Sequence, residues 1–339
     1  MKALRLTLCL ALGLLAGSAG AAGGNYAQRA EVRQFIAEMV EKHGFVKREL
    51  VRLFRDTRFQ PAILRAMSVP PESPARSWQA YRDLFVSPAR IEAGVRFRGM
   101  HAATLDRASA EFGVPAEIIV AIIGVETAYG RNMGAWRVID ALATLAFDFP
   151  RRAEYFRGEL EHFLLHARDE GIDILATRGS YAGAIGMPQF MPGSYRSFAL
   201  DYDGDGRRDI EGSAADAIGS VANFLKAHGW AAGQPVAVPA SVEGGSHRRL
   251  IDSGIRPQVR AADLASFGVS ALAALPPEAL CALIELDSAG QDSQFRIGLQ
   301  NFYVLTRYNR SSFYAAAVLD LAQALSEAKN PAATGTDAR

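Results

Sequence analysis

The sequence is poor in cysteine, which limits how the fold can be held together. Only two of its 339 residues are cysteines. Cys9 lies in an N-terminal segment that we expect to be removed, so Cys281 has no partner and no intramolecular disulfide can form. Because Cys281 lies in the apolar run ALCALIEL, we interpret it as a buried structural thiol rather than a nucleophile.

Net charge is also scarce. The chain has 37 lysines and arginines against 36 acidic residues, a formal charge of +1 that becomes −1 when Lys2 and Arg5 are removed. A nucleic-acid-binding protein normally carries a basic excess, so that class is excluded. Apolar residues make up 49% of the chain, enough for a substantial core in about two or three domain-sized units.

The apolar run near the N-terminus is short. Residues 6–15 fall well below the roughly 20 residues needed to span a bilayer, and no cysteine follows LLAGS for lipid attachment, so we expect no membrane anchor. The segment has the basic start and the small-residue Ala19-Gly20-Ala21 site of a secretory signal. We therefore predict that residues 1–21 are a cleaved signal peptide.

Helical periodicity dominates the rest of the chain. Residues 26–77 predict an N-terminal helical region that is closed by the loop SVPPESPA, and residues 78–230 predict a mainly α-helical core. In residues 231–296, GQPVAVPASV and HRRLIDSGIRPQVRA predict small strands in an inserted α/β subdomain. Helical periodicity returns in residues 297–326, and residues 327–339 predict a disordered tail.

A single carboxylate in an apolar helix is the first chemical signal. GVETAYGRNMG follows VPAEIIVAIIG, whose apolar residues cover nearly every helical face, so we expect an enclosed helix. Glu126 comes about one turn before Gly130, the expected terminator, where unpaired carbonyls make the potential negative. Desolvation and the helix dipole should both raise the pKa of Glu126, as a general acid for glycosidic cleavage requires. An ion pair with Arg131 is the alternative.

Two further segments carry polar and aromatic side chains that suit a sugar. RGSYAGAIGMPQFMPGSY combines them with many glycines, which let backbone approach a ligand closely. RYNRSSFY places a tyrosine-asparagine pair and a second tyrosine in an otherwise apolar helical stretch. Each segment has a structural alternative: a tightly packed loop for the first, and for Asn309 a cap on a helix beginning near Ser311.

In this order, GVETAYGRNMG, SYAGAIGMPQFMPGSY and RYNRSSFY resemble the lytic murein transglycosylase B family, and the similarity covers about Trp78 to Leu325. The resemblance implies a mainly α fold with a lysozyme-like helical core. It also implies a periplasmic enzyme that cleaves the β-1,4 bond between N-acetylmuramic acid and N-acetylglucosamine in peptidoglycan and leaves a 1,6-anhydromuramoyl end. Glu126 falls on the single catalytic acid/base. The implied substrate-binding positions are Ser180, Gln189, Tyr308, Asn309 and Tyr314, with Tyr81, Arg151 and Tyr155 as further cleft candidates.

The resemblance has two departures. Met187 and Pro188 precede Gln189 where the family has more glycine, and the lipid-attachment cysteine of some members is absent, so we expect a soluble protein. The expected partners are peptidoglycan glycan strands and other cell-wall enzymes. We expect a monomer, no nucleic acid and no organic cofactor.

Most glycosidases use two carboxylates. Asp140 and Asp148 are the candidates for a second one here, but we interpret each as a helix cap or an ion-pair partner. The family's chemistry needs only one. Glu126 protonates the leaving oxygen, the muramoyl 2-acetamido carbonyl stabilises C1, and the C6 hydroxyl then attacks C1 of its own sugar at an effective molarity of up to about 10⁵ M or more. By the same resemblance Asn309 or Tyr308 would hold the acetamido group, and Ser180 would contact Glu126 or the sugar. The alternatives are a hydrolytic muramidase and a non-catalytic peptidoglycan-binding protein.

The segment DYDGDGRRDIEGSAAD, residues 201–216, opens like an EF-hand calcium loop, with aspartates at alternate positions followed by glycine. Three acidic side chains within five residues would repel one another without a cation, so we favour a structural calcium site over a solvated turn. Gly212 replaces the usual bidentate glutamate, which displaces the closing ligand. The predicted ligands are Asp201, Asp203, Asp205, Arg207 through its carbonyl, Asp209 and, as the closing ligand, Asp216.

Overall fold

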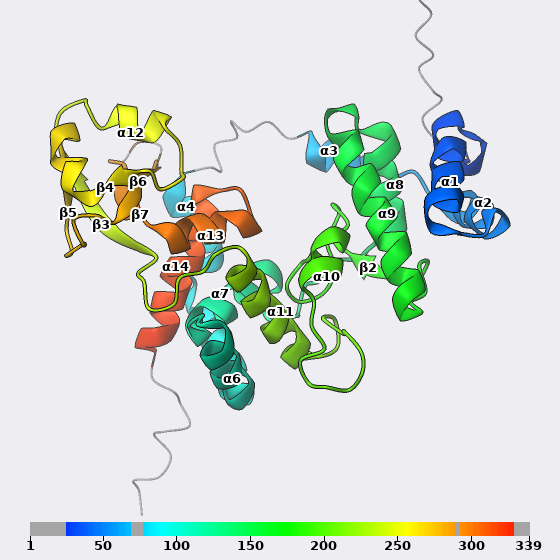
Figure 1. Ribbon diagram of the computed structural model, residues 1–339, viewed down its shortest axis with the longest axis horizontal. Helices are drawn as coiled ribbons and strands as arrows, with labels where there is room; N and C mark the ends of the chain where they lie inside the picture. Colours follow the sequence, from blue (N-terminus) through cyan, green and yellow to red (C-terminus); the bar gives the residue numbers. More distant parts are fainter. Residues whose placement is uncertain (1–24, 69–76, 289, 291, 329–339) are drawn as a thin grey trace, which may run out of the picture. The chain divides into compact units, whose positions relative to one another are not determined.

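The computed structural model describes residues 25–68, 77–288, 290 and 292–328 (Figure 1). The predicted signal peptide and the predicted tail from residue 329 onward lie outside these residues. The chain divides into two compact units, Met1–Phe59 and Gln60–Arg339.

The first unit is a small helical region. It contains the 3-10 turn η1 (Tyr26–Gln28), α1 (Ala30–His43) and α2 (Lys47–Asp56). Apolar residues at helical spacing face one another across the two helices, and the rings of Phe35 and Phe54 meet edge to face with their centroids 5.9 Å apart. The helical prediction is confirmed, but the boundary expected at residue 77 is not. Pro61–Met67 (α3) belongs to the second unit, where it packs against α8.

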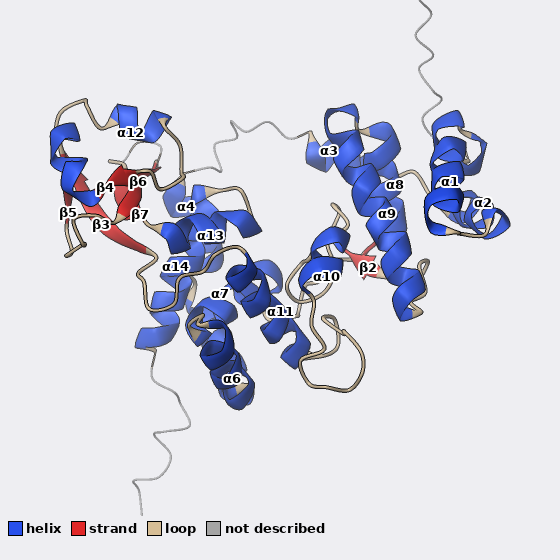
Figure 2. Cartoon of the chain, in the orientation of Figure 1, coloured by secondary structure: helices blue, strands red, loops and turns tan. Residues whose placement is uncertain are grey.

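The second unit is built mainly from helices, as the sequence predicts (Figure 2). Between α3 and the sheet these are α4 (Trp78–Phe85), α5 (Pro88–Met100), α6 (Ala102–Phe112), α7 (Ala116–Thr127), α8 (Val138–Asp148), α9 (Ala153–Glu170), α10 (Pro192–Phe198) and α11 (Ala214–Ala227). After the sheet come α13 (Gln300–Tyr308) and α14 (Ser312–Glu327). A two-residue ladder pairs β1 (Trp136–Arg137) with β2 (Arg178–Gly179).

Helix α7 is enclosed by its neighbours. It packs against α5, α6, α11 and α14, and Ile119, Val120, Ile122 and Ile123 are fully buried, so the prediction of an enclosed helix is confirmed. Gly130 is not its terminator. The helix ends at Thr127, and Ala128 caps it with a left-handed backbone, φ 53°, while its N–H bonds to the carbonyl of Gly124.

The strain of this non-glycine cap is offset by the next residue. Tyr129 is also left-handed, with φ 63°, and its ring folds back over Gly124, where an added Cβ would lie 2.7 Å from the phenol oxygen. Its hydroxyl donates to the carbonyl of Arg90 over 3.0 Å. Burial of this ring therefore fixes how α7 ends.

A five-stranded antiparallel sheet forms the inserted subdomain. Its strands are β3 (Ala237–Val242), β4 (Val259–Arg260), β5 (Val269–Ala271), β6 (Leu280–Leu286) and β7 (Gln294–Gly298), in the order β4-β6-β7-β3-β5. In Figure 2 they gather beside α13 and α14, and β6 contacts α14 while β7 contacts α13. One face of the sheet forms a core of its own with Leu250 of α12 (Arg248–Asp252) and with Leu264 of the 3-10 segment η4 (Ala261–Phe267).

The strand predictions were right in part. GQPVAVPASV contains β3, but HRRLIDSGIRPQVRA forms the helix α12, whose Leu250 packs into the sheet's core, and only the two-residue β4. The longest strand lies instead in ALCALIEL. Cys281 sits in that strand fully buried, and burial raises the pKa of its thiol to about 11, so the prediction of an inert structural cysteine is confirmed.

Among the described helices, none alone has the length and apolar character to cross a bilayer. Helices α6 and α7 pass that test only as a pair, which bends by 113° at the break between them. The apolar faces of α7 are buried inside the protein.

Candidate active site

Glu126 lies in the last turn of α7 and is partly buried. Burial raises the pKa of its carboxyl to about 7, and a hydrogen bond from the hydroxyl of Tyr314 to Oε1, 2.7 Å long, opposes the rise. Near neutral pH a large fraction of Glu126 is therefore protonated, as a general acid requires. Enclosure is the main cause of the shift.

The alternative of a glutamate paired with Arg131 is wrong. The Nε of Arg131 donates to the carbonyl of Ala128 over 3.2 Å. In the part of the chain that the structure describes, no lysine or arginine forms an ion pair with Glu126. The polar partner of this carboxyl is a neutral tyrosine from α14.

Three tyrosines, Tyr81, Tyr308 and Tyr314, interact electrostatically with Glu126. Burial first, and then the charge of Glu126, raise the pKa of Tyr81 to about 12 and lift those of Tyr308 and Tyr314 well above their usual range. The rings of Tyr308 and Tyr314 are stacked, with centroids 6.2 Å apart and planes 12° apart. All three phenols remain protonated near neutral pH and can act as hydrogen-bond donors. Tyr314 donates to Glu126, and Tyr308 donates to the carbonyl of Pro188.

The loop from Gly186 to Phe190 is fastened beside the end of α7. Thr127, which follows Glu126 and is 1% exposed, donates through Oγ1 to the carbonyl of Met187 over 2.8 Å and accepts the N–H of Gly130 over 3.0 Å. The hydroxyl of Tyr308 donates to the carbonyl of Pro188 over 2.6 Å. The same residues that flank Glu126 thus hold this loop.

Gln189 and Ser180 turn out to organise the glycine-rich segment. Gln189 has a left-handed backbone, φ 51°, and its Nε2 donates to the carbonyls of Met133 and Gly186, over 3.1 and 3.0 Å. The Oγ of Ser180 accepts the N–H of Ala184 over 3.0 Å. No hydrogen bond joins Ser180 to Glu126 among the described residues, which leaves the sugar as its predicted contact. The tightly packed loop that we considered as an alternative describes this segment well.

A groove of about 1010 Å³ receives four of the predicted cleft residues: Tyr155, Gln189, Tyr308 and Asn309. Its floor is aromatic. Phe224 lies between Phe198 and Tyr308, at centroid distances of 5.0 and 4.8 Å. Flat apolar floors with polar rims suit sugar rings, whose faces carry C–H groups and whose edges carry hydroxyls.

One prediction about the groove needs correction, and the structural alternative considered for Asn309 is wrong. Arg151 is exposed on the 3-10 turn η3 (Pro150–Arg152) and does not line the groove, whereas its neighbour Arg152 does and lies over the ring of Tyr155. The sequence FPRR offered both arginines, and only the turn decides between them. Asn309 does not cap α14 either. Ser311 does so, accepting the N–H of Tyr314 over 3.3 Å, and the Asn309 side chain is left exposed on the groove.

Sequence reasoning missed the groove's other lining residues. Six of them lie in segments that the sequence had singled out: Phe190, Met191, Gly193 and Ser194 in SYAGAIGMPQFMPGSY, and Arg307 and Arg310 in RYNRSSFY. The others come from outside these motifs: Arg152, Glu159, His162, Ser197, Phe198, Phe224 and His228. The second acid candidate, Asp140, lies elsewhere and forms the expected ion pair, with Arg137 at 2.7 Å.

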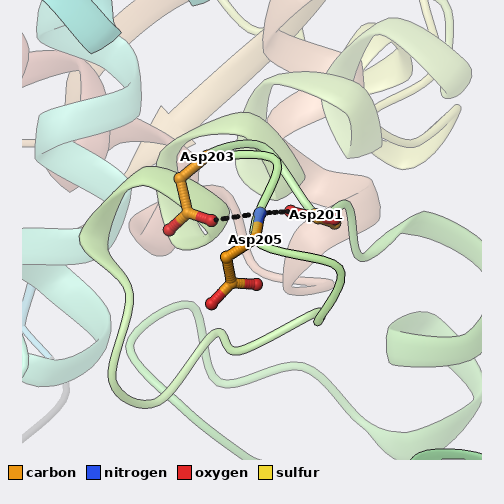
Figure 3. Close-up of side chains that lie close together, drawn as sticks. All are labelled: Asp201, Asp203 and Asp205. Atoms are coloured by element: carbon orange, nitrogen blue, oxygen red, sulfur yellow. Dashed lines mark hydrogen bonds between the residues drawn. The ribbon is translucent and has the colours of Figure 1, made fainter.

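The aspartate-rich loop brings three carboxylates together (Figure 3). Ligand oxygens of Asp201, Asp203 and Asp205 lie within 4.8 Å of one another. Backbone N–H groups set their orientation, and Asp201 alone accepts those of Gly204, Asp205 and Gly206 over 2.7 to 3.1 Å. Calcium takes oxygen ligands at about 2.3–2.6 Å, so two of its ligands lie up to about 5 Å apart. The three side chains fit that ion.

Asp216 plays a different part from the one predicted. It is fully buried, and its two carboxylate oxygens accept the N–H groups of Tyr202, Asp203 and Asp209 over 2.6 to 3.2 Å. Burial raises its pKa, and these hydrogen bonds oppose the rise. Both oxygens already accept hydrogen bonds from backbone N–H groups. The geometry therefore favours a role for Asp216 in stabilising the loop, and not the predicted role of a bidentate closing ligand.

Comparisons with known proteins agree on one relationship. The model of the Transglycosylase SLT domain family matches residues 27–323. Membrane-bound lytic murein transglycosylase B of Escherichia coli (strain K12) is 44% identical over 315 residues, which cover 91% of this chain and 86% of that protein.

Two solved structures extend the comparison. The Escherichia coli lytic transglycosylase Slt35 in complex with calcium has a TM-score of 0.80 at 44% identity and covers 90% of this chain and 95% of its own. SltB3 of Pseudomonas aeruginosa in complex with NAG-anhNAM-pentapeptide has a TM-score of 0.76 at 32% identity and covers 90% of this chain and 80% of its own.

Proposed function

Because this chain belongs to the Transglycosylase SLT domain family, we propose that it is a peptidoglycan lytic transglycosylase. It cleaves the β-1,4 bond between N-acetylmuramic acid and N-acetylglucosamine and leaves a 1,6-anhydromuramoyl end. The observation that carries this proposal is Glu126, whose pKa of about 7 suits a proton donor near neutral pH. The anhydromuramoyl ligand held by SltB3, a relative at 32% identity, supports the product.

The reaction needs no second carboxylate. Glu126 gives its proton to the glycosidic oxygen, and the C1–O bond breaks with its electron pair going to the N-acetylglucosamine leaving group. The muramoyl acetamido carbonyl bonds to C1 in its place. Glu126, now a carboxylate, takes the proton from the C6 hydroxyl, O6 attacks C1 and the acetamido oxygen leaves. The proton has returned to Glu126, and the strand carries the anhydro ring.

The surrounding residues serve binding and orientation. Tyr314 holds Glu126 in place through its 2.7 Å hydrogen bond. Tyr308, Asn309, Gln189 and Tyr155 line the groove as the binding surface for the glycan strand. Tyr81 completes the set through its charge interaction with Glu126. Ser180 contacts the sugar while it closes the glycine-rich loop.

A structural calcium ion belongs to the same proposal. Asp201, Asp203 and Asp205 would hold it through side chains, with the Arg207 carbonyl and Asp209 as further ligands. The ion would neutralise the crowded carboxylates and stabilise the folded loop, because it binds the folded state only. The complex of Slt35 with calcium supports this assignment.

We also propose export and cleavage after about Ala21, so that the enzyme meets its substrate in the periplasm as a soluble monomer. N-terminal sequencing of the exported protein would then start near Ala22. A mature chain that retained Lys2 would contradict this.

Mass spectrometry of the products tests the function. The full chain is incubated with purified peptidoglycan, and the released muropeptides are weighed. Anhydro products, one water lighter than hydrolysed ones, are expected. Hydrolysed products would identify a muramidase on the same scaffold, and binding to the sacculi with no release would identify a non-catalytic binding protein.

A further inference from the structure

The groove that Tyr308 and Asn309 line carries more positive charge than a neutral sugar needs. Three arginines line it, Arg152, Arg307 and Arg310, against a single acidic residue, Glu159. The Glu159 carboxylate accepts the N–H of Gly193 over 2.8 Å. The rest of the chain is nearly balanced in charge, so this concentration of arginine is local.

Two of these three arginines, Arg307 and Arg310, form no ion pair with a carboxylate among the described residues. The third, Arg152, lies over the rings of Tyr155 and Phe156, at 4.4 and 5.2 Å from their centroids. Arg307 and Arg310 are exposed, and among the residues that the structure describes neither forms an ion pair.

Paired arginines are common elsewhere in the second unit. Five that form ion pairs with carboxylates are Arg82, Arg98, Arg208, Arg248 and Arg296. Arg307 and Arg310 place two guanidinium groups, neither in an ion pair among the described residues, on the wall of one groove. Guanidinium groups bind carboxylates through two parallel hydrogen bonds, which makes a carboxylate the natural ligand here.

Their position fits a strand lying in the groove. Arg307 stands in the last turn of α13 and Arg310 follows Asn309 in the turn before α14. Tyr155 of α9 lines the groove together with Arg310. Tyr308 between them stacks on Tyr314, the partner of Glu126.

We propose that Arg307 and Arg310 form an anion subsite that binds carboxylates of the peptidoglycan strand and thereby makes the enzyme selective for acidic strands over neutral sugars. This inference rests on the proposed function. The carboxylates can come from the peptide stem or, where no stem is attached, from the lactyl group of muramic acid itself. Both present the same chemistry to the arginines.

The experiment compares Arg307→Ala, Arg310→Ala and the double variant with the wild type on two substrates. One consists of strands that carry peptide stems, and the other of strands from which an amidase has removed the stems, which leaves only lactyl carboxylates. The double variant should raise KM about tenfold while kcat stays within about twofold, because binding is lost equally from ground and transition states. Arg256→Ala, an exposed arginine of the inserted subdomain, is the matched control and should leave KM unchanged.

The two substrates distinguish the source of the carboxylate. A rise in KM only on peptide-bearing strands assigns the subsite to carboxylates of the stem. A rise only on stem-free strands assigns it to the lactyl carboxylate, which the amide bond to the stem masks on peptide-bearing strands, and a rise on both shows that the subsite accepts either. Unchanged KM on both overturns the inference. The variants Arg307→Lys and Arg310→Lys keep the charge and should recover part of the affinity, which shows that the alanine effect is electrostatic.

Binding measurements separate this inference from the proposed function. The dissociation constant of soluble strands is measured for the Glu126→Gln protein, with and without the two arginine substitutions, and with N-acetylglucosamine oligomers as a probe without carboxylates. The substitutions should weaken strand binding about tenfold and leave oligomer binding unchanged. If the wild type released no anhydro product while this difference persisted, the proposed function would fail and the subsite would stand.

Discussion

Two groups of carboxylates in this protein are handled in opposite ways. Glu126 lies at the end of an apolar helix, where burial raises its pKa to about 7 and a single tyrosine hydroxyl contacts it. Asp201, Asp203 and Asp205 lie together on an intermediate to exposed loop, with backbone N–H groups pointing at them. The first environment favours the protonated acid, and the second favours charge and a cation.

The difference shows that residue type alone does not decide what a carboxylate does. An aspartate among amide donors is prepared to bind a metal, and a glutamate among buried side chains is prepared to give up a proton. Substitutions that keep size but change protonation therefore test each environment separately.

The largest effect should come from Glu126→Gln. Loss of the proton donor should lower kcat on peptidoglycan about a thousandfold, within the range for general acid–base catalysis. Release of anhydromuropeptides measures it. Glu117→Gln, at the other end of the same helix, is the matched control and should retain activity.

The same substitution has a pH signature in stability. The pKa of Glu126 is higher in the folded chain, about 7, than its usual 4.5, so protonation favours folding. This contribution is fully present below about pH 4.5 and is lost as the pH rises through about 7. The free energy of unfolding, measured with urea, should therefore fall less between pH 5 and pH 9 for Glu126→Gln than for the wild type.

The second effect concerns the aspartate loop. Adding calcium at about 100 times its Kd should stabilise the fold by about 2.7 kcal/mol and raise Tm by several degrees. The double substitution Asp201→Asn and Asp203→Asn should abolish this rise, while Asp106→Asn, on the exposed face of α6, should keep it. Thermal melts with calcium and with a chelator measure it, and an undiminished calcium response in the double variant would place the ion elsewhere.

Tyr314→Phe should sharpen the account of Glu126. The hydroxyl of Tyr314 lowers the pKa of Glu126, so its removal should raise that pKa and move the alkaline limb of the pH–kcat/KM profile to higher pH. The maximum should fall about tenfold, because Glu126 loses its anchor. Tyr303→Phe on α13 is the control. An alkaline limb that moved to lower pH would contradict the assigned role of the hydrogen bond.

Thr127→Val should have the smallest effect. It removes a hydroxyl that bridges the Met187 carbonyl and the Gly130 N–H, and the unpaired groups should cost about 1–2 kcal/mol. Urea unfolding measures the loss. Thr306→Val is matched, since Thr306 is equally buried but bonds only to Tyr303 within its own helix. Equal losses in the two variants would show that the bridge to the Met187 loop contributes nothing.

Much of the fold could be predicted because local patterns and burial agree. The apolar run of α7 has no polar face to expose, so it had to be a core helix. RRLID failed, since a short stretch with two apolar residues fits a strand or a helical turn equally well, and packing of Leu250 against the sheet decides. The boundary predicted at residue 77 differs from the one after Phe59 for the same reason, because only contact with α8 assigns α3 to the second unit.

The candidate site divides in the same manner. Glu126, Tyr308 and Tyr314 could be found from motifs, and the structure brings them together across more than 180 residues of sequence. Phe198 and Phe224 could not be found from the motifs, since they meet only where α10 and α11 pack together. Arg151 was chosen over Arg152 because a sequence does not show which way a 3-10 turn faces.

The sequence by itself determined that one carboxylate lies in an apolar helix and that three aspartates crowd one loop. Both follow from the positions of the residues along the chain, which can be seen without a structure. The tertiary structure decided the chemistry of each, because pKa depends on what surrounds a group rather than on what precedes it in the chain. Tyr314 reaches Glu126 from the far end of the sequence, and Asp216 turns its oxygens to the backbone instead of to the aspartate cluster.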